Sequence, residues 1–308
     1  MSSRESVVEE VWAGLQEPPR TLNPKWFYDA RGSALFDAIT QQPEYYPTRA
    51  ELEILRGRGR EVSRWIGADA VLAELGAGNG EKAVALLKWL IRPHAYVPVD
   101  ISSASLETAV HGIRRAMPGI RVEALCLDFM QGFHWPEETS AAHRCLVFFG
   151  STIGNMEPDQ AREWMVRVRS ALGANDKMLV GVDLVKDASV LNQAYNDRAG
   201  VTAAFNLNAL THLNHETGSN WDPKSFRHVA FFNPEKGRVE MHLEAVQPQV
   251  VQMGPHQLAL EPGERIHTEN SYKYSLESFR DLAQSAGFHI DQVWLDGRRW
   301  FSLHGLSV

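Results

Sequence analysis

The stretch VLAELGAGNGEKAVALLKWLI, residues 71–91, decides the fold of this chain. Its first five residues form an apolar run that is too short for a helix and predicts a buried strand. Its last eleven residues repeat apolar side chains at helical spacing. Gly76, Gly78 and Gly80 lie between the two segments. Because glycine has no Cβ, the backbone can adopt positive φ there and a ligand can approach the main chain closely.

The spacing of these glycines indicates which ligand the loop binds. A dinucleotide-binding loop needs the pattern GxGxxG, and Glu81 stands where that pattern requires its last glycine. A pyrophosphate would also be repelled by Glu74 and Glu81, whereas S-adenosylmethionine carries no phosphate. An acidic residue followed by xGxGxG is similar to the first motif of class I methyltransferases. We therefore expect S-adenosylmethionine here; the alternative is a glycine-rich turn without a ligand.

A second acidic residue favours the cofactor over the bare turn. The run AYVPVD predicts another strand, which ends at Asp100, about two dozen residues after Gly76. A carboxylate at the end of the second strand of a doubly wound sheet can accept hydrogen bonds from both ribose hydroxyls. The glycine loop and Asp100 are thus two independent observations that both favour S-adenosylmethionine.

The composition excludes several classes of protein. With 308 residues, 44% hydrophobic and 22% charged, the chain resembles an ordinary globular protein. Its net charge of −7 and its dispersed basic residues argue against a nucleic-acid partner. No apolar run reaches the ~20 residues of a membrane span, and the N-terminus lacks the pattern of a targeting segment. Cys126 and Cys145 lie in apolar runs, so we expect buried thiols without a disulfide, in a cytoplasmic protein.

Strands and helices alternate regularly after the glycine loop. Apolar strands are predicted at 95–99, 120–125, 145–149 and 177–182, with helices beginning near Ser102 and at Pro158. Such continuous apolar strands predict a parallel sheet covered on both faces. A helix capped by Ser275 and a final strand–turn–strand pattern are expected to close one sheet edge. The fold class is therefore α/β, a doubly wound Rossmann-like class I methyltransferase core.

The remaining sequence predicts a second, smaller α+β domain that binds substrate. Residues 1–65 show helical patterns and no strand signal, and residues 185–274 interrupt the alternation with a hairpin that places Val239, Met241 and Leu243 on one face. We expect 51–184 and 275–308 to form the core. We expect 1–50 and 185–274 to form the second domain and to roof the carboxyl ends of the parallel strands.

Several loops after the strands carry candidate site residues. Asp128 and Phe129 offer an acceptor for an adenine amino group and an apolar face for its ring, or form an ordinary turn. Gly150 allows close backbone approach, and Asn155 either contacts a ligand or caps the helix at Pro158. His212 and His215 are spaced as a ligand pair, but scattered histidines explain them better, so no metal is predicted. The aromatic residues that include Tyr28 and Tyr45 either pack a core or bind a ligand.

Longer motifs carry a specific resemblance over nearly the whole chain. They are KWFYDARGSALFDAIT, PEYYPTRAE, ELGAGNGEK, YVPVD, FFGSTIGN, GVDLVKD, AYNDRAGVTAAFN and HTENSYKY. Together these motifs resemble the histidine-specific Nα-methyltransferases of ergothioneine biosynthesis. Those enzymes make hercynine, the trimethylated betaine of L-histidine, from three molecules of S-adenosylmethionine, with S-adenosylhomocysteine as the second product. One departure lies in the loop, where Asn79 and Gly80 stand at positions expected to hold Thr and Ser.

The resemblance also implies roles for individual residues. Cofactor contacts are implied for Gly76, Lys82, Asp100, Asp128 and Phe129, and the glycine pattern adds Gly78 and Gly150. Histidine contacts are implied for Tyr45, Asn155, Tyr195, Glu269 and Ser271, with Tyr28 and Phe36 beside the amine and Met241 near the imidazole. Tyr28 and Asn155 are the catalytic candidates.

Two other functions stay open at this point. One is methylation of a different amino acid or small amine by the same fold. The other is a non-catalytic module that binds S-adenosylmethionine. Under the favoured hypothesis the partners are small molecules, L-histidine and its mono- and dimethyl intermediates, and we expect a monomer.

Overall fold

A computed structural model of the chain describes residues 4–139 and 143–308. These residues form two compact units, each made of two separate stretches of sequence. The larger unit comprises Tyr46–Lys186 and Ser271–Val308. The smaller unit comprises Asp187–Asn270 and the described part of Met1–Tyr45.

The larger unit is built on an eight-stranded sheet. Its strands are β2 (Ala70–Leu75), β3 (Ala95–Asp100), β4 (Arg121–Val122), β5 (Leu125–Cys126), β6 (His143–Phe148), β7 (Lys177–Asp183), β13 (His289–Leu295) and β14 (Phe301–Ser307). Their order is β13-β14-β7-β6-β2-β3-β4, and β5 also pairs with β3. Neighbours from β4 to β7 are parallel, whereas β14 is antiparallel to both β7 and β13.

The direction of winding reverses at β2, which pairs with β3 on one side and β6 on the other. Every residue of β2 is buried. This burial on both faces explains why the strands are continuous apolar runs. The predicted doubly wound α/β core is confirmed by this strand order. In such sheets, ligands bind outside the carboxyl ends of the strands at the point of reversal.

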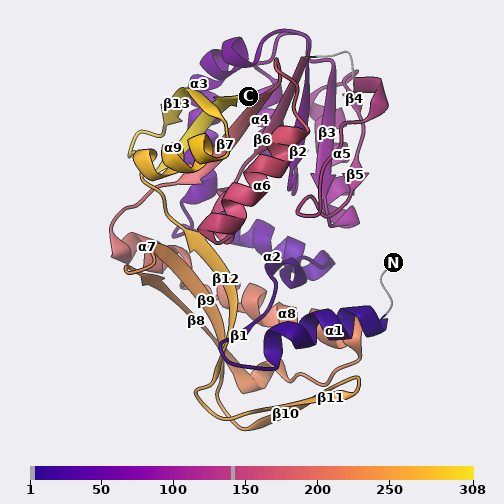
Figure 1. Cartoon of the computed structure of the whole chain (residues 1–308), viewed down its shortest axis with the longest axis vertical. Coiled ribbons are helices and arrows are strands. Elements are labelled where there is room, and N and C mark those ends of the chain that lie inside the picture. The colour runs from indigo at the N-terminus through magenta and orange to yellow at the C-terminus, as the bar shows by residue number, and fades with distance from the viewer. Residues whose placement is uncertain (1–3, 140–142) are drawn as a thin grey trace. The chain divides into compact units, whose positions relative to one another are not determined.

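Helices cover both faces of this sheet. They are α3 (Pro47–Ile66), α4 (Glu81–Leu87), α5 (Ser103–Ala116), α6 (Pro158–Ser170) and α9 (Leu276–Ser285), with the short 3-10 helices η2 (Glu137–Thr139) and η3 (Thr152–Asn155). Val71 packs in one apolar cluster with Trp164 of α6 and Phe279 of α9. The next residue, Leu72, packs in a second cluster with Leu86 of α4, together with side chains of α3 and α5. Figure 1 shows α6 in front of the strands.

The smaller unit joins helices to a four-stranded sheet of order β1-β12-β9-β8. Its strands are β1 (Arg20–Thr21), β8 (Phe226–Asn233), β9 (Arg238–Ala245) and β12 (Arg265–Tyr272), with a separate hairpin of β10 (Gln249–Met253) and β11 (His256–Leu260). The last two residues of β12 belong to the larger unit. Its helices are α1 (Arg4–Leu15), α2 (Ala30–Thr40), α7 (Ala188–Ala194) and α8 (Val201–Thr217), with η1 (Pro24–Phe27) and η4 (Pro223–Ser225).

The predicted β8–β9 hairpin is confirmed, and Val239, Met241 and Leu243 are buried. Leu243 packs with Leu210 and Leu213 of α8. Helix α8 lies beside β8 and β9, so the smaller unit has its own apolar core under this sheet. Figure 1 shows α8 and α1 in this unit.

Four local predictions are wrong. β1 provides a strand within 1–65, where none was expected, by pairing with β12. The helix predicted over 81–91 ends at Leu87. The strand predicted over 120–125 is split into β4 and β5, which have two residues each. Cys126, expected to be buried, is exposed because β5 is a short strand with little cover, whereas Cys145 is buried and both thiols are free.

A membrane-spanning helix is absent from the described residues, because none of their helices is both long and apolar enough.

Candidate active site

The glycine loop is held over the end of β3 by main-chain hydrogen bonds. The N–H groups of Gly76 and Ala77 donate to the carbonyl of Val99 at 2.8 and 3.0 Å. The N–H of Gly78 donates to Oδ2 of Asp100 at 3.0 Å. The φ angles of Gly76 and Gly78 are +71° and +53°, a region that favours glycine. The loop and the acidic residue predicted to act with it therefore form one hydrogen-bonded group.

The departure at Asn79 and Gly80 has a local explanation. Gly80 has φ of +76°, and a Cβ placed on it would lie 3.2 Å from the Cβ of Ala109. Asn79 accepts a hydrogen bond from the N–H of Glu81 through its side chain, at 3.0 Å. A serine at position 80 would be strained in this chain, so glycine suits this form of the loop.

Asp100 is oriented through both of its carboxylate oxygens. Oδ1 accepts from the N–H of Ser102 at 2.9 Å, while Oδ2 accepts from Gly78. Burial raises the pKa of Asp100, and these backbone donors oppose that shift. The carboxylate is thus held rigidly at the end of β3, where it can also accept a hydrogen bond from a hydroxyl donor.

Phe129 adds an aromatic face to this group. A Cβ placed on Gly76 would lie 3.7 Å from the Phe129 ring. The ring packs edge-on against Phe148, with 5.6 Å between centroids. Asp128 accepts from the N–H of Met130 at 2.9 Å, so its side chain forms part of the turn that presents Phe129. Gly76, Asp100 and Phe129 therefore gather at the ends of neighbouring strands.

Lys82 and Gly150 meet at a buried glutamate that the sequence did not indicate. Glu51 of α3 has an exposed fraction of 0%. Its Oε2 lies 2.7 Å from Nζ of Lys82 and accepts from the N–H of Gly150 at 2.9 Å. Burial raises the pKa of Glu51, and Lys82 opposes the shift. A glutamate within a charged amphipathic helix gives no signal of such a role, and both of its partners are distant in sequence.

Glu74 corrects one step of the sequence argument. Its carboxyl group is buried within β2 and accepts a hydrogen bond from the hydroxyl of Tyr96 at 2.5 Å. Burial raises the pKa of Glu74 to about 8, so the group is mostly uncharged at neutral pH. Charge repulsion by Glu74 therefore does not help to exclude a pyrophosphate, and that argument rests on the spacing of the glycines and on Glu81.

Asn155 is the last residue of η3 and lies near the end of β12. A Cβ placed on its neighbour Gly154 would be 2.7 Å from the carbonyl oxygen of Tyr272, so the two backbones are in close contact. Ser271, adjacent to Tyr272, accepts a hydrogen bond from Lys273 at 2.7 Å. The alternative that Asn155 caps α6 is wrong, because the capping residue is Glu157.

A buried group of charges lies next to Ser271. Nζ of Lys273 is 2.8 Å from Oδ2 of Asp183, and Lys186 and Tyr46 also bond to this carboxylate. Although burial raises the pKa of Asp183, the two lysines hold it below its usual value. The group ties α3, β7 and the segment that contains Ser271 into one network.

Four of the predicted substrate residues form an aromatic group in the smaller unit. Tyr28 packs edge-on against Phe36 at 6.0 Å, Phe36 against Tyr45 at 6.3 Å, and Tyr45 against Tyr195 at 6.4 Å. Phe205 of α8, which the sequence did not indicate, contacts both Tyr28 and Phe36. These residues come from η1, α2, α7 and α8 and their flanking turns, so the tertiary fold assembles the group.

The other predicted substrate residues of the smaller unit lie on its sheet. Met241 is buried in β9, and its carbonyl accepts from the hydroxyl of Thr268 at 3.1 Å. Glu269 lies in the neighbouring strand β12, and its carbonyl oxygen is 3.0 Å from Nε2 of His267.

His212 and His215 lie on α8 with different surroundings. Nδ1 of His212 bonds to the carbonyl of Trp26 at 2.8 Å, whereas the side chain of His215 is exposed and pairs with Glu216.

The chain is similar to known proteins over nearly its whole length. Residues 7–308 match the family described as histidine-specific methyltransferase, SAM-dependent. The histidine N-alpha-methyltransferase of Mycobacterium tuberculosis is 40% identical over 299 residues, covering 96% of this chain and 92% of the relative. That of Mycolicibacterium smegmatis is 40% identical over 307 residues, covering 98% and 95%. The 4-dimethylallyltryptophan N-methyltransferase of Claviceps purpurea is 27% identical over 316 residues, covering 94% and 91%.

Proposed function

This chain belongs to the family of histidine-specific, S-adenosylmethionine-dependent methyltransferases, and on that premise we propose that it methylates the α-amino group of L-histidine. Three successive transfers give hercynine in ergothioneine biosynthesis. The observation that carries the proposal is the extent of the match: residues 7–308 span both units, and therefore both the glycine loop and the aromatic group.

The proposed cofactor residues suit S-adenosylmethionine chemically. Asp100 offers a fixed carboxylate for ribose hydroxyls, and Phe129 offers a ring face for adenine. Gly76 and Gly78 let the main chain approach the ligand. The bound sulfonium supplies an activated methyl group. We assign the cofactor to Gly76, Gly78, Lys82, Asp100, Asp128, Phe129 and Gly150.

The aromatic group suits a substrate amine that gains charge and bulk. Each transfer is an in-line displacement, so the amine must be neutral and held about 3 Å from the methyl carbon. Tyr28 and Phe36 offer ring faces to the growing quaternary ammonium, which attracts them by cation–π interaction. Tyr28 and Asn155 are proposed to orient the amine and are the catalytic candidates. Tyr45 and Tyr195 are proposed to bind the same substrate through their hydroxyls.

Glu269 is proposed to select histidine by accepting the imidazole N–H. An amino acid without this donor would leave the carboxylate unpaired, which disfavours its binding. Met241 would pack near the imidazole, and Ser271 would offer a further hydroxyl to the substrate. We also propose that the enzyme acts as a monomer in the cytoplasm, with no metal in the methyl transfer.

One incubation tests the function. The protein is mixed with S-adenosylmethionine and equal amounts of the common amino acids and 4-dimethylallyltryptophan, and the products are identified by mass. We expect histidine alone to gain one, two and three methyl groups, with a sample that lacks S-adenosylmethionine as the control. Methylation of another compound would establish the second hypothesis. Cofactor binding without any methylated product would instead identify a binding module.

A further inference from the structure

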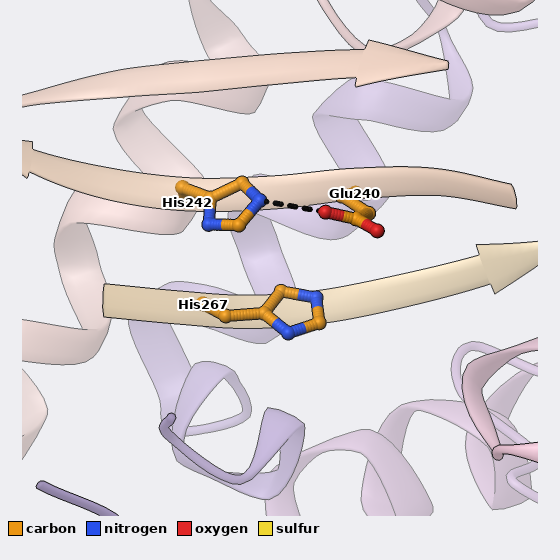
Figure 2. A group of neighbouring side chains, drawn as sticks. All are labelled: Glu240, His242 and His267. Atoms are coloured by element: carbon orange, nitrogen blue, oxygen red, sulfur yellow. Dashed lines mark hydrogen bonds and ion pairs between the residues drawn. The ribbon is translucent and has the colours of Figure 1, made fainter. Parts of the chain in front are cut away.

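A group of two histidines and one glutamate lies on the sheet of the smaller unit, where His267 contacts Glu269, one of the proposed substrate residues. Glu240 and His242 alternate along β9, so both point to the same face, and His267 lies on the adjacent strand β12. One donor atom from each of the three side chains lies within 4.8 Å of the others. Figure 2 shows the three side chains together.

The carboxylate of Glu240 is already oriented by its neighbours. Oε1 accepts from Nε of Arg238 at 2.9 Å and from Nδ2 of Asn233 at 3.1 Å. Oε2 instead faces Nε2 of His242 at 3.1 Å, the bond drawn in Figure 2. Although burial raises the pKa of Glu240, the bonds from Arg238 and His242 hold it below its usual value. The group therefore presents one ionised oxygen in a fixed direction, as partners of a metal ligand do.

The two imidazoles lie against each other, and they must tilt to bind one ion because each nitrogen lone pair lies in the plane of its ring. Their rings stack with 4.8 Å between centroids, and the ring of Phe231 stacks on His242. Burial lowers the pKa of His242 to about 4, with His267 contributing, so His242 is neutral near pH 7. Nε2 of His267 is on the side of the ring that faces Glu240 and His242 (Figure 2), and it lies 3.0 Å from the carbonyl oxygen of Glu269. A neutral His267 ring donates its N–H to that carbonyl, so this hydrogen bond must break and the ring proton must move to Nδ1 before Nε2 can bind a cation.

We propose that Glu240, His242 and His267 form a binding site for a divalent transition cation such as Zn²⁺. Two donors on a zinc ion with bonds of ~2.0–2.1 Å lie about 3.3 Å apart in tetrahedral geometry. The 3.1 Å between Nε2 of His242 and Oε2 of Glu240 is close to that separation. Wider donor pairs in the group must close by about 1–2 Å on binding.

The cation takes the position of the proton shared by His242 and Glu240. The Nε2 lone pair of His242 then binds the cation, and the ring proton moves to Nδ1. Nδ1 is buried and has no hydrogen-bond partner within the described residues. The ring can therefore change tautomer without breaking a second bond. Two imidazoles and one carboxylate leave further coordination positions for water.

The charge around the group decides which class of cation it selects. Arg238 already compensates the carboxylate, so the site offers little net negative charge. Hard cations such as Mg²⁺ depend on several charged oxygen ligands, whereas borderline cations gain from imidazole nitrogen. The site therefore discriminates between Zn²⁺ and Mg²⁺.

The test measures binding of Zn²⁺ and of Mg²⁺ to the whole protein by titration calorimetry, without cofactor or substrate. We expect one Zn²⁺ site and no comparable Mg²⁺ site. His242→Ala and His267→Ala should each weaken Zn²⁺ binding on the order of 100-fold. Loss of a residue that only hydrogen-bonds to a metal ligand costs about 10- to 100-fold in affinity, and loss of the ligand itself should cost at least as much. His215→Ala removes an exposed histidine of the same unit and should leave the affinity unchanged.

A second measurement guards against misfolded variants. Co²⁺ added to the wild-type protein should give visible absorption bands of a nitrogen- and oxygen-coordinated ion, and Glu240→Gln should change them while retaining the shape of the side chain. Zn²⁺ affinity equal in wild-type protein and a folded His242→Ala/His267→Ala double variant would overturn the site. So would Co²⁺ bands unchanged by Glu240→Gln, or wild-type protein that binds Zn²⁺ no better than Mg²⁺.

Discussion

Nζ of Lys82, in the first turn of α4, lies 2.7 Å from Oε2 of Glu51, which is buried near the start of α3. The same carboxylate accepts the N–H of Gly150, in the loop after β6. One side chain thus ties together two parts of the proposed cofactor site that the glycine loop alone does not connect. Removing the partners of a buried carboxylate strongly destabilises the folded state. Glu51, Lys82 and the N–H of Gly150 therefore depend on one another.

Glu51→Gln should weaken binding of S-adenosylmethionine by about tenfold and lower the free energy of unfolding by about 1–3 kcal/mol. The amide keeps the shape but cannot balance the charge of Lys82. Calorimetry and chemical denaturation measure the two effects. The control is Glu61→Gln, an exposed residue of the same helix paired with Arg58, which should change neither quantity. Equal behaviour of the two variants would show that Glu51 only fills space.

Asp100→Ala should weaken binding of S-adenosylmethionine by on the order of 1.5–3 kcal/mol, because charge-assisted hydrogen bonds to the ribose hydroxyls are lost. It also removes the acceptor for the N–H of Gly78, so the loop loses an anchor. Calorimetry decides the outcome, with exposed Asp69→Ala as the control. An unchanged affinity would remove Asp100 from the proposed site.

Glu74→Gln should make stability less dependent on pH. The pKa of Glu74 is raised from 4.5 to about 8, so the folded state favours the protonated carboxyl. This contribution is fully present below pH 4.5 and is lost as the pH rises to about 8, by up to ~1.4 kcal/mol per pH unit. The variant should therefore gain stability relative to wild type between these limits, measured by denaturant unfolding at several pH values. Exposed Glu81→Gln is the control. If the difference in stability between Glu74→Gln and wild type did not change with pH, Glu74 would be ionised in the folded state.

The central part of the fold was predictable because its signals are local. The strand, glycine loop and helix around Gly76 lie within one short stretch, and the caps Ser102 and Ser275 act within one turn of their helices. The apolar runs of β2, β3 and β7 needed no knowledge of their partners, since both faces of these strands are buried.

The remainder depends on contacts that the sequence does not show. Helix α8 buries two polar residues. Asn206 bonds to His242 and Thr268, and Asn208 bonds to Asp29, so the buried face of the helix is not a continuous apolar stripe. β1 is a two-residue strand that exists only through its pairing with β12.

The candidate site also contains both residues with local sequence signals and residues defined by remote contacts. The glycine loop and Asp100 were indicated by local patterns, but Glu51 and Phe205 were not, because packing and remote partners define them.

Glu269→Ala should reduce the preference for histidine over phenylalanine and tyrosine, because the proposed partner of the imidazole N–H is lost. Binding of histidine should weaken more than binding of the competitors, and selectivity should fall before the rate does. Competition assays read by mass give the ratio, with exposed Glu261→Ala as the control. An unchanged preference would place imidazole recognition elsewhere.

Asn155→Ala should slow methyl transfer more than Tyr28→Phe. The first variant removes a proposed anchor, and a misplacement of ~1 Å can cost about 10²-fold. The second removes only a hydroxyl and keeps the ring. Single-turnover rates at saturating substrate compare the two, and both should rise with pH until the bound amine is deprotonated. If Tyr28→Phe abolished transfer and Asn155→Ala did not, Tyr28 would be the general base.

The chain of edge-on rings from Tyr28 through Phe36 and Tyr45 to Tyr195 has a consequence for the lifetime of each bound species. If these rings surround the amine, every added methyl group replaces an N–H donor with apolar surface, and the third methyl group fixes a positive charge that aromatic faces attract. Mono- and dimethylhistidine would then dissociate more slowly than histidine itself. Free intermediates should stay scarce during turnover, and escape of the finished betaine should become the slow event of the cycle.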